Sequence, residues 1–535
     1  MLDDVGHNCG IAAVFVRGSL KKYEPYYPKL GNGNGADKHD AMLLMYKLLL
    51  NLQNRGQLSA GITSFCPDRD QLLKTYRELG QVNEVFKISS PEKRKSLINR
   101  YSGEKMIGHV RYATCGRDDR NYAQPFERVH GRTWKWFAFG FNGNIANYSE
   151  LKEKLIEKKD YHITRDTDTE IIMHYLAKEL RGDEKPDLVK VFSNLSNILD
   201  GAWSLVFING DGDIVIARDK LGIRPVCYSI TNELVVAASE SSALVNCGIT
   251  EFKHLGPGEM LLISGDKVEI KKFASSSTTA RCMFEWVYFA NVATTIDDRS
   301  VYMVRKRLGE ELANMETQEI DKDWIVVPVP DTARAAADSF AYKLGLMSME
   351  GLIRNRYVGR TFIEGESRED KVRNKYTALP EIMAGKKVLL VDDSIVRGTT
   401  SKKLIKYIRE IGKAKEVHVR VSCPPILGPC FYGIDMSTVS ELIAPQYATD
   451  AKSLVDGKLP DAMLDKMAKD LGADSLIYQT IPGLLRAIDL SDDQVCLACL
   501  TNKYPTKYGQ KLYQVAFEDF KKGSKESKRT YEKSC

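Results

Sequence analysis

The sequence predicts two successive units of different fold class. The first, over residues 9–280, is an α+β unit rich in β-sheet, and the second, over residues 281–505, is an α/β unit with a mainly parallel sheet. Up to about residue 280, many short β-like runs alternate with turn residues, and few segments have helical periodicity. After about residue 300, apolar strand-like runs alternate with amphipathic segments, which is typical of parallel strands joined by crossover helices. A chain of 535 residues also exceeds what one hydrophobic core usually organises.

The individual elements follow from local runs of residues. In the first unit the expected strands are IAAVFV, WSLVFI, DIVIAR, LVVAAS and MLLIS, and the clearest expected helices are AMLLMYKLLLNL and DTEIIMHYLAKEL. In the second unit we expect strands at WIVVPVP, KKVLLV and EVHVRV. The segment SKKLIKYIREIG predicts a helix with an apolar face of Leu404, Ile405, Ile408 and Ile411. GNGNG at 31–35 predicts a surface turn, and residues 506–535 predict a flexible basic tail.

Composition and charge narrow the class of protein. With 43% apolar and 28% charged residues, the chain resembles an ordinary soluble globular protein. Its net charge of +6 is concentrated at the end, where residues 521–535 carry six Lys or Arg against two Glu, so a nucleic-acid partner is disfavoured. No apolar run approaches the roughly 18 residues that span a membrane, and MLDDVGHN lacks the regions of a signal peptide. We therefore expect a cytoplasmic protein with no membrane partner, whose 11 cysteines act as buried thiols, nucleophiles or metal ligands rather than disulfides.

The stretch KKVLLVDDSIVRGTTSKKL at 386–404 predicts an anion site. A buried strand, a Gly-containing loop and a helix N-terminus follow one another, so unpaired amide N–H groups and the helix dipole face the loop. The stretch contains neither GxxxxGK[ST] nor GxGxxG, which argues against a nucleotide P-loop or a dinucleotide loop. Asp392 and Asp393 would repel a bare phosphate, unless the ligand also offers hydroxyl groups or brings Mg²⁺. The alternative is that the two aspartates only cap the following helix.

This stretch resembles the phosphoribosyl pyrophosphate (PRPP) motif of type I phosphoribosyltransferases. RNRYVGRTFIEGESREDKVRNKY at 354–376 resembles the flexible catalytic loop of the amidophosphoribosyltransferase family. The resemblance implies that Asp392 and Asp393 hold the ribose hydroxyls and Mg²⁺, and that Thr332 in VPVPDTAR is a metal-site hydroxyl. It also implies a 5-phosphate site at Ser394, Arg397, Gly398, Thr399, Thr400 and Ser401, and a pyrophosphate site at Arg354, Arg356, Arg360 and Lys375, whose charge suits that role.

A second resemblance covers the first unit. HNCGIAAVF places Cys9 and Gly10 at the head of a β-like run, and LQNRGQLSAGI, IGHVRYATCG, GFNGNIANY and TRDTDTE follow in the same order as in class II glutamine amidotransferases. The resemblance implies an Ntn-hydrolase αββα sandwich in which Cys9 is the N-terminal nucleophile and residues 1–8 are a propeptide. Once exposed, an α-amine with a pKa near 8 can accept the thiol proton without a catalytic His. Alone, a Cys near the start of a chain is more often a buried small residue.

The same resemblance assigns the rest of the glutamine site. Arg111 would clamp the α-carboxylate of glutamine, and Asp168 would pair with its α-ammonium group. The Asn142 side chain and the Gly143 N–H would form an oxyanion hole, with Gly56 lining the pocket. Taken singly, Asn142 and Gly143 could instead form a hairpin turn, and Arg111 a surface ion pair.

The chain departs from the family pattern at three places in the first unit. Asn54 stands where the family usually has His, Val110 stands where it usually has Thr, and residues 18–38 look like an added loop. These departures bear on local packing more than on the chemistry.

Four cysteines form a predicted metal-binding set. Cys496 and Cys499 in QVCLACLTNKYP have C-x2-C spacing, which suits zinc, an iron-sulfur cluster or a redox pair. Cys282 and Cys430 lie in segments that resemble those bearing 4Fe-4S ligands in the cluster-containing branch of the family, so the resemblance implies a structural 4Fe-4S cluster. Cys423 is the nearest rival ligand. Cys66, Cys115, Cys227 and Cys247 are expected to be core thiols, with Cys535 on the tail.

Together these resemblances imply that ammonia released from glutamine passes through a channel to PRPP and displaces pyrophosphate, giving 5-phosphoribosylamine. They imply a homotetramer or dimer and purine nucleotide inhibitors. Two other functions are weighed against this one. A sugar-phosphate aminating isomerase would not need DDSIVRGTTS, and a non-catalytic PRPP or nucleotide sensor would not need the four residues Cys9, Arg111, Asn142 and Asp168.

Overall fold

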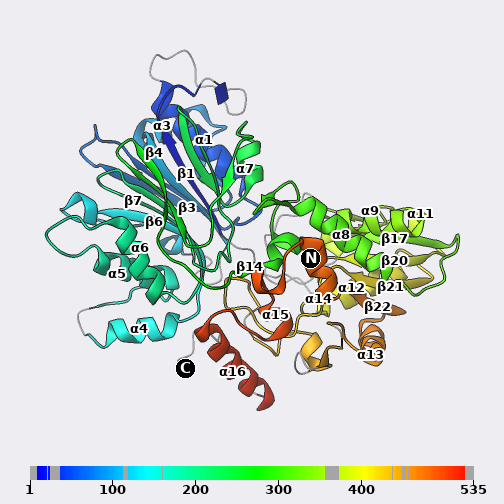
Figure 1. Cartoon of the computed structure of the whole chain (residues 1–535). Coiled ribbons are helices and arrows are strands. Elements are labelled where there is room, and N and C mark those ends of the chain that lie inside the picture. The colour runs from blue at the N-terminus through cyan, green and yellow to red at the C-terminus, as the bar shows by residue number, and fades with distance from the viewer. Residues whose placement is uncertain are drawn as a thin grey trace.

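The structure of the protein is a computed structural model that describes residues 9–20, 22–23, 36–112, 119–158, 161–355, 373–436, 438–448, 453–455 and 457–523. Two layered units lie side by side: the first is built around two stacked sheets and the second around a single sheet (Figure 1). In the described part of the chain, no helix is both long enough and apolar enough to span a lipid bilayer.

The first unit contains two antiparallel sheets. The seven-stranded sheet has the order β11-β9-β10-β1-β4-β2-β3. Its strands are β1 (Gly10–Val16), β2 (Ser59–Phe65), β3 (Leu73–Leu79), β4 (Lys105–Arg111), β9 (Cys227–Ile230), β10 (Leu234–Ala238) and β11 (Lys253–His254). The six-stranded sheet has the order β13-β12-β8-β7-β6-β5. Its strands are β5 (Phe126–Arg128), β6 (Phe137–Ile145), β7 (Gly201–Asn209), β8 (Ile214–Arg218), β12 (Glu259–Ser264) and β13 (Lys267–Lys272).

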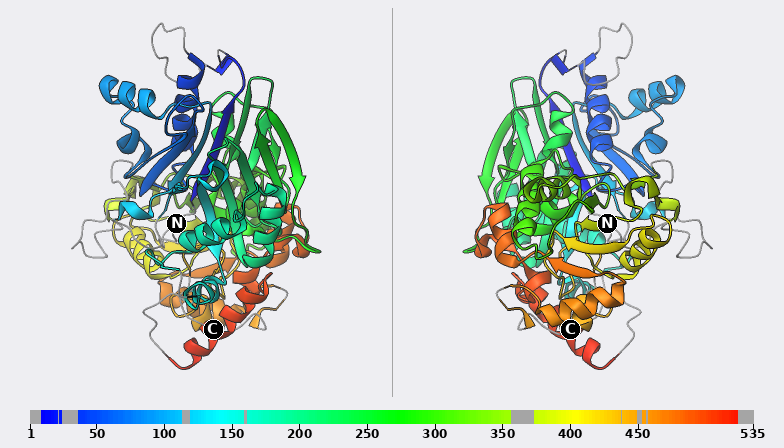
Figure 2. Two further views of the ribbon diagram at one scale, coloured as in Figure 1. Left: turned by 90° about the vertical axis from the view of Figure 1, so that its left-hand side faces the viewer. Right: turned by 90° about the vertical axis from the view of Figure 1, so that its right-hand side faces the viewer.

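Helices cover the outer faces of both sheets (Figures 1 and 2). On the seven-stranded sheet lie α1 (Ala36–Asn51), α2 (Val82–Phe86), α3 (Pro91–Tyr101) and α7 (Ser241–Val245), and on the other lie α4 (Tyr148–Ile156), α5 (Asp168–Glu179) and α6 (Leu188–Ile198). Strand β1 shows why its run is apolar on both faces. Val14 packs toward α1, whereas Ile11 and Phe15 pack toward the six-stranded sheet. The predicted αββα sandwich is confirmed.

The second unit has a four-stranded parallel sheet of order β17-β20-β21-β22. Its strands are β17 (Trp324–Pro328), β20 (Lys387–Asp392), β21 (Glu416–Val421) and β22 (Ser475–Tyr478). Helices α8 (Val301–Asn314) and α9 (Arg334–Leu344) cover one face, and α12 (Thr399–Glu410) and α13 (Asp461–Leu471) cover the other. Because all four strands run the same way, their carboxyl ends meet at one edge, where Asp392 ends β20. The predicted parallel sheet is confirmed.

The C-terminal segment returns to the junction between the units. Strand β14 (Arg281–Cys282) pairs in parallel with β23 (Val495–Cys496), and a π-helical turn, η4 (Glu285–Phe289), follows β14. The remaining elements are the hairpins β15 (Thr295–Ile296) with β16 (Arg299–Ser300) and β18 (Leu352–Arg354) with β19 (Tyr376–Ala378), the helices α11 (Pro380–Met383), α14 (Ile481–Ile488), α15 (Ala498–Thr501) and α16 (Lys507–Lys521), and the short 3-10 turns η2 (Arg120–Tyr122), η3 (Thr133–Lys135), η5 (Ala444–Gln446) and η7 (Asp492–Gln494).

Every strand run and helix segment expected above is found, but two local predictions were wrong. Residues 507–521 form α16 rather than a flexible tail, because Leu512 and Ala516 are buried and the Thr506 side chain caps the helix start. Ile411 is 40% exposed, because α12 ends at Glu410 and only Leu404, Ile405 and Ile408 reach the core. The turn at 31–35 lies outside the described residues. The boundary near residue 281 falls between the end of β13 and the start of β17 and stays a prediction.

Candidate active sites

Three residues predicted for glutamine recognition meet at one end of the seven-stranded sheet. Cys9 directly precedes β1, and its Sγ lies 3.8 Å from the carbonyl oxygen of Tyr112. Tyr112 follows Arg111, which ends β4, the antiparallel neighbour of β1. A Cβ at Gly56 would lie 2.5 Å from the carbonyl carbon of Arg111, so only glycine allows this approach. The fold therefore brings Cys9, Gly56 and Arg111 together from three separate segments.

The predicted oxyanion residues lie on β6 in the other sheet. His109 Nε2 and the carbonyl oxygen of Phe141 are 3.0 Å apart, which ties the two sheets together directly before Asn142. Burial lowers the pKa of His109 to about 3, although its bond to Phe141 opposes this, so His109 is neutral and donates that bond. Asn142 is fully buried, and neither its Nδ2 nor its Oδ1 has a hydrogen-bond partner among the described residues. Gly143 has a φ of +153°, and a Cβ there would lie 1.9 Å from the carbonyl oxygen of Ala202.

Asp168 begins α5 and faces the end of β6. Its Oδ2 accepts a hydrogen bond from the Ile145 N–H at 3.4 Å. Burial raises the pKa of Asp168 to about 6, although hydrogen bonds from neighbouring residues oppose the shift. Gln124, which no motif indicated, accepts a hydrogen bond from the Phe141 N–H at 2.7 Å and donates one to Thr169 Oγ1 at 3.4 Å. Gln124 thus fixes the start of α5 to the strand that carries Asn142.

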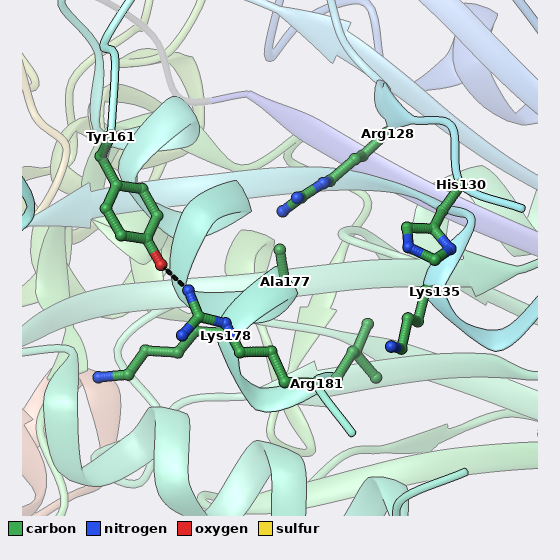
Figure 3. Close-up of a pocket in the computed structure, with 8 residues that line it drawn as sticks. Arg128, His130, Lys135, Tyr161, Ala177, Lys178 and Arg181 are labelled. Carbon is green, nitrogen blue, oxygen red and sulfur yellow. Dashed lines mark hydrogen bonds between the residues drawn. The ribbon is translucent and has the colours of Figure 1, made fainter. Parts of the chain in front are cut away.

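The far end of α5 borders a separate cavity of about 120 Å³ (Figure 3). Its lining is mostly basic and comes from Arg128, His130, Lys135, Tyr161, Ala177, Lys178, Leu180 and Arg181. The first lining residue on α5 is Ala177, so the cavity begins about 14 Å from Asp168 along the helix at 1.5 Å per residue. It is no part of the glutamine-recognition cluster.

In the second unit, three predicted ligands gather where β20 ends. Thr332 Oγ1 donates a hydrogen bond to Asp393 Oδ2, and Ser394 Oγ donates one to Asp393 Oδ1 at 2.7 Å. Asp392 Oδ1 accepts a hydrogen bond from the Asp393 N–H at 2.8 Å. Both aspartates are buried, and Thr332 reaches them from the segment after β17. Two carboxylates and a hydroxyl form the all-oxygen donor set that Mg²⁺ prefers.

The loop after these aspartates ends at the N-terminus of α12, as predicted. Gly398 has a φ of +73°, and a Cβ there would lie 2.3 Å from Cδ1 of Ile443. The Ser401 hydroxyl in the first turn is buried and has no hydrogen-bond partner within the described ranges. Thr399 and Thr400 begin the same helix. Arg397 Nε donates a hydrogen bond to Glu441 at 2.9 Å, and its place in the phosphate site stays a prediction.

The predicted pyrophosphate residues are only partly described. Arg354 ends β18, and its Nη1 donates a hydrogen bond to Asp331 Oδ2 at 3.0 Å. The Asn355 N–H donates a hydrogen bond to the carbonyl oxygen of Lys375 at 3.0 Å, so the two ends of the predicted catalytic loop lie together. Arg356 and Arg360 lie outside the described residues.

The four predicted cluster cysteines lie around the junction. Cys282 and Cys496 are direct partners in the β14–β23 pair. Burial and the proximity of the other thiols raise the pKa of Cys499 and of Cys496, and burial raises that of Cys282 to about 11. Cys430 is among the thiols that act on Cys499, and so is the rival Cys423, which means that proximity alone does not separate the two. Within the ranges that the structure describes, no three His, Cys, Asp or Glu side chains are close enough to hold a single metal ion. The four cysteines therefore lie in the same region, but their side chains are not arranged around a single ion.

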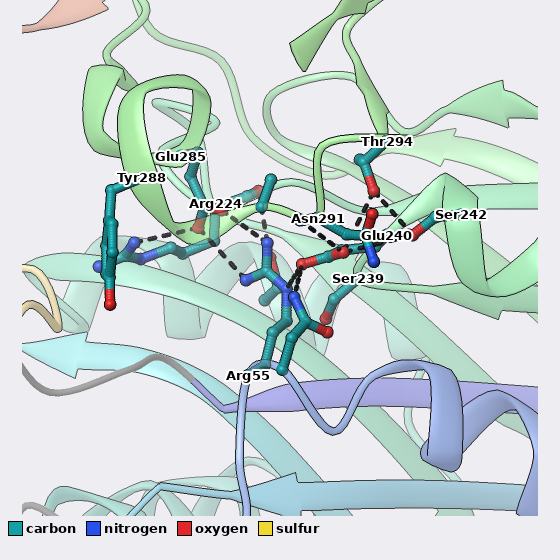
Figure 4. Close-up of polar contacts among 12 residues, drawn as sticks. Arg55, Arg224, Ser239, Glu240, Ser242, Glu285, Tyr288, Asn291 and Thr294 are labelled. Atoms are coloured by element: carbon teal, nitrogen blue, oxygen red, sulfur yellow. Dashed lines mark hydrogen bonds and ion pairs between the residues drawn. The ribbon is translucent and has the colours of Figure 1, made fainter. Parts of the chain in front are cut away.

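A buried ion network joins the two units (Figure 4). Arg55 Nε lies 2.6 Å from Glu240 Oε1, and Arg55 Nη2 lies 2.6 Å from Glu285 Oε2. Arg224 contributes a second contact to Glu285 at 3.2 Å and also donates to the carbonyl oxygen of Tyr432 at 3.1 Å. All four charged side chains are at most 1% exposed. Burial alone would lower the pKa of Arg55, but Glu285 and Glu240 outweigh it and raise that pKa.

Contacts at this junction reach both sides of the predicted glutamine site: the segment of Gly56 on one side, and strand β6 with Asn142 on the other. Arg55 is bonded to Gly56 along the chain, and Asn54, the departure from the family pattern, donates a hydrogen bond to Glu240 at 2.9 Å. On the other wall, Asn144 Nδ2 donates to the carbonyl oxygen of Phe431 at 2.9 Å. Phe431 follows Cys430, so the cysteine-bearing loop supports the strand of Asn142.

A single arginine links the π-helical turn to the second unit. Arg305 on α8 is 3% exposed, and its guanidinium donates to the carbonyl oxygens of Trp286, Tyr288 and Ala290, each at 2.9 Å. Burial lowers the pKa of Arg305 to about 10, although the charge of Asp393 opposes this. The turn η4 is therefore held by Glu285 on the side of the first unit and by Arg305 on the side of Asp393.

Comparisons with known proteins identify both units. Residues 91–254 match a glutamine amidotransferase domain, and residues 303–427 match a phosphoribosyl transferase domain. The chain is 39% identical over 466 residues to the amidophosphoribosyltransferase of Archaeoglobus fulgidus, covering 86% of this chain and 94% of that protein. It is 35% identical to the Bacillus subtilis amidophosphoribosyltransferase, covering 88% and 93%.

Solved structures agree with these relatives. A B. subtilis glutamine PRPP amidotransferase, complexed with ADP and GMP, superposes with a TM-score of 0.77 at 32% identity and covers 94% of this chain and 98% of that chain. A structure described as the allosteric regulatory enzyme of purine biosynthesis gives a TM-score of 0.77 at 33% identity.

The fold and the two sites therefore define an enzyme in which a glutamine amidotransferase domain is joined to a phosphoribosyltransferase domain. Because relatives more than 30% identical are covered almost completely, the chain belongs to the amidophosphoribosyltransferase family.

Proposed function

We propose that this chain converts PRPP, glutamine and water to 5-phosphoribosylamine, glutamate and pyrophosphate, in the first step of purine biosynthesis. The observation that carries the proposal is the presence of two clusters of predicted site residues in one chain, one around Cys9 and one around Asp393. The buried turn η4 lies between them. The match to a phosphoribosyl transferase domain argues against an aminating isomerase, which has no such domain. The presence of Cys9, Arg111, Asn142 and Asp168 argues against a non-catalytic sensor, which would not need them.

At the first site, Cys9 is the nucleophile once residues 1–8 are removed. Its new α-amine takes the thiol proton, and the sulfur attacks the carboxamide carbon of glutamine. The buried Asn142 amide and the Gly143 N–H stabilise the oxyanion, which fits the lack of any protein partner for Asn142. His109 is unsuited to be the base, because burial lowers its pKa to about 3 and makes it a weak proton acceptor. Its Nε2–H is already bonded to the Phe141 carbonyl oxygen. The protonated α-amine passes that proton to the leaving nitrogen, so ammonia departs and a thioester forms, and water then releases glutamate and restores the thiol.

Arg111 and Asp168 orient the glutamine. The Arg111 guanidinium offers two parallel N–H donors to the α-carboxylate, which lysine could not do. Ionised Asp168 pairs with the α-ammonium group. Gly56 lets its own segment pack directly against the Arg111 backbone, because any side chain there would collide with it, and this packing fixes Arg111 beside the pocket.

At the second site, ammonia attacks C1 of PRPP and pyrophosphate leaves from the opposite face with inversion. Asp392 and Asp393 accept hydrogen bonds from the ribose hydroxyls, and the amides at the start of α12 hold the 5-phosphate. Bound Mg²⁺ would neutralise the leaving pyrophosphate, held by the oxygens of Thr332 and the two aspartates. Arg354 and Lys375, with Arg356 and Arg360, complete the pyrophosphate site.

We also propose that Cys282, Cys430, Cys496 and Cys499 hold a 4Fe-4S cluster with a structural role. The four thiols are drawn together at the junction, and soft thiolate ligands suit such a cluster. Zinc is the alternative occupant of four thiolates. In either case the group would hold β14 against β23 and fix the loop that contacts Asn144.

Regulation, assembly and location extend the proposal. A relative was solved with ADP and GMP, and we propose purine nucleotide inhibition of this chain as well. We further propose a homotetramer or dimer that works in the cytoplasm.

The proposal is tested by a Cys9→Ala variant of the mature chain. Pyrophosphate release driven by glutamine should be lost, while release driven by ammonium salts should persist. A Cys66→Ala variant, which removes a buried thiol elsewhere in the first unit, should retain both activities. Loss of both activities in Cys9→Ala would argue against two separable sites.

A further inference from the structure

The basic cavity at the end of α5 is built from separate parts of the first unit (Figure 3). Arg128 ends β5, Lys135 ends η3, and Arg181 follows the C-terminal end of α5. Their side chains stand around Ala177, with His130 beside them (Figure 3). Four permanent cations and a histidine therefore line a cavity of about 120 Å³ that contains no acidic lining residue.

The nearby carboxylates are committed to other groups. Glu127 accepts a hydrogen bond from Trp136 Nε1 at 2.8 Å, Glu179 accepts one from Asn194 at 2.7 Å, and Asp183 pairs with Arg132 at 2.7 Å. Among the described residues, none of the four lining cations is within ion-pair distance of a carboxylate; they are Arg128, Lys135, Lys178 and Arg181. Like charges brought together without counter-charges repel one another, so the cavity favours an anion.

A purely structural explanation covers only part of the cluster. Cations near a helix C-terminus interact favourably with the helix dipole, which accounts for Lys178 and Arg181. Arg128 and Lys135 come from other elements and gain nothing from that dipole. The Tyr161 hydroxyl accepts a hydrogen bond from Arg181, which holds that guanidinium in place before any ligand arrives. His130 Nδ1 accepts from the Arg132 N–H at 2.9 Å, which leaves Nε2 as the donor nitrogen of the ring.

We propose that this cavity binds a compact anion carrying two or more phosphate groups, at a site separate from both active sites. Arginine forks match phosphate oxygens with two parallel N–H donors, and lysines add point charges. The cavity is too small for an extended polymer and has room for a diphosphate or triphosphate group. Such a group can come from an inorganic polyphosphate or from a nucleoside polyphosphate.

Direct binding to the full chain tests the proposal. Inorganic tripolyphosphate is titrated into the protein by calorimetry without added magnesium, and a Lys135→Gln/Arg181→Gln variant should bind it at least tenfold more weakly. The control, Lys95→Gln/Lys190→Gln, removes two exposed cations of the same unit outside the cavity and should bind like the wild type. A second variant, Ala177→Glu, places a carboxylate among the cations and should abolish binding, and glutamate is well tolerated in a helix.

Two outcomes would overturn the proposal: equal binding by the wild type and the cavity variants, or equal loss in the control variant. Parallel titrations with pyrophosphate, ADP and adenosine distinguish the sources of the phosphate groups. Binding of ADP no tighter than pyrophosphate indicates an inorganic anion, tighter binding indicates a nucleotide, and equal binding of adenosine and ADP contradicts recognition through phosphate. Because the cavity variants should keep glutamine-dependent pyrophosphate release, this test stands or fails separately from the proposed enzyme activity.

Discussion

At the scale of single residues, the first unit maintains polar groups in states that are costly without a ligand. Asn142 is buried with an amide that finds no partner within the described structure, and the half-buried Asp168 has a pKa of about 6. An unpaired buried amide costs about 1–3 kcal/mol of stability. A glutamine substrate would compensate both groups, because its ammonium group pairs with Asp168 and its developing oxyanion accepts from Asn142.

The raised pKa of Asp168 predicts a pH dependence. Only the ionised carboxylate pairs with an ammonium group, and the protonated fraction in the free enzyme grows as the pH falls through about 6. The KM for glutamine should therefore rise below about pH 6, while ammonia-dependent activity at a fixed NH₃ concentration should not show this transition. An Asp168→Asn variant should have a high KM for glutamine without that pH step. Steady-state kinetics between pH 5 and 8 provide the measurement, and an unchanged step in Asp168→Asn would assign it to another group.

Removing the Asn142 amide should act on the transition state. Loss of one oxyanion donor typically costs about 10²- to 10³-fold in kcat, so Asn142→Ala should lose glutaminase turnover by that factor. Ammonia-dependent pyrophosphate release should be unchanged, since it bypasses the first site. The matched control is Asn194→Ala, whose amide bonds Glu179 on the helical layer. Comparable losses in both variants would indicate a folding defect instead.

At the scale of elements, the sequence was most informative where burial is simplest. Strands such as β1 and β20 are apolar on both faces because both are covered, so their runs stand out without a partner being known. The candidate site residues come from several short motifs in a fixed order, and their roles stay predictions. The helix α16 could not be predicted from its basic composition, since its apolar contacts are made with distant segments.

Buried polar residues were the least predictable part of the site. The buried ion network joins residues that are far apart in the chain: Arg55, Arg224, Glu240 and Glu285. No sequence spacing pattern predicts that they pair. The same is true of Gln124 and Arg305, which act through backbone groups of other elements. Charged residues in a sequence are ordinarily read as surface, and only the fold shows which of them are enclosed.

The network predicts a stability effect with a diagnostic double variant. Arg55→Met leaves the buried Glu240 without its cation, which should lower the free energy of unfolding by about 3–5 kcal/mol. Arg55→Met/Glu240→Gln should recover part of that loss, because the uncompensated charge is gone. Urea denaturation followed by tryptophan fluorescence measures both. If the double variant is less stable than the single one by the full cost of a second mutation, the two side chains are not coupled.

The four predicted ligand cysteines lead to a prediction about bound iron and about which cysteines are needed to hold it. Protein purified without oxygen should contain iron and sulfide and absorb in the visible range, and Cys496→Ser should lose both and melt at a lower temperature. Cys423→Ser, which alters the buried rival thiol, should keep the cluster. Elemental analysis decides between occupants, since zinc without iron in the wild type would replace the cluster assignment with a zinc site. Loss of iron in Cys423→Ser would revise the ligand set.

At the scale of the whole molecule, the two recognition clusters are connected through η4. Glu285 ties the turn to Arg55, next to Gly56, and Arg305 ties its carbonyl groups to the helix beside Asp393. Ammonium is no nucleophile, so the nitrogen must travel as neutral ammonia, away from water. A turn fixed at both ends is suited to keep the space between the sites closed.

Arg305 is the residue whose replacement should open that space. Arg305→Met leaves the carbonyl groups of Trp286, Tyr288 and Ala290 without their shared donor, so η4 should loosen while the side chains at both sites remain. Ammonia should then escape, and glutamate should form in excess of pyrophosphate, whereas the wild type should form them in equal amounts. Lys306→Met, the adjacent residue on α8 that pairs with Glu310 at the surface, should keep equal amounts. Coupled assays of both products give the ratio, and a ratio of one in Arg305→Met would mean that the turn does not retain ammonia, even if both rates fell together.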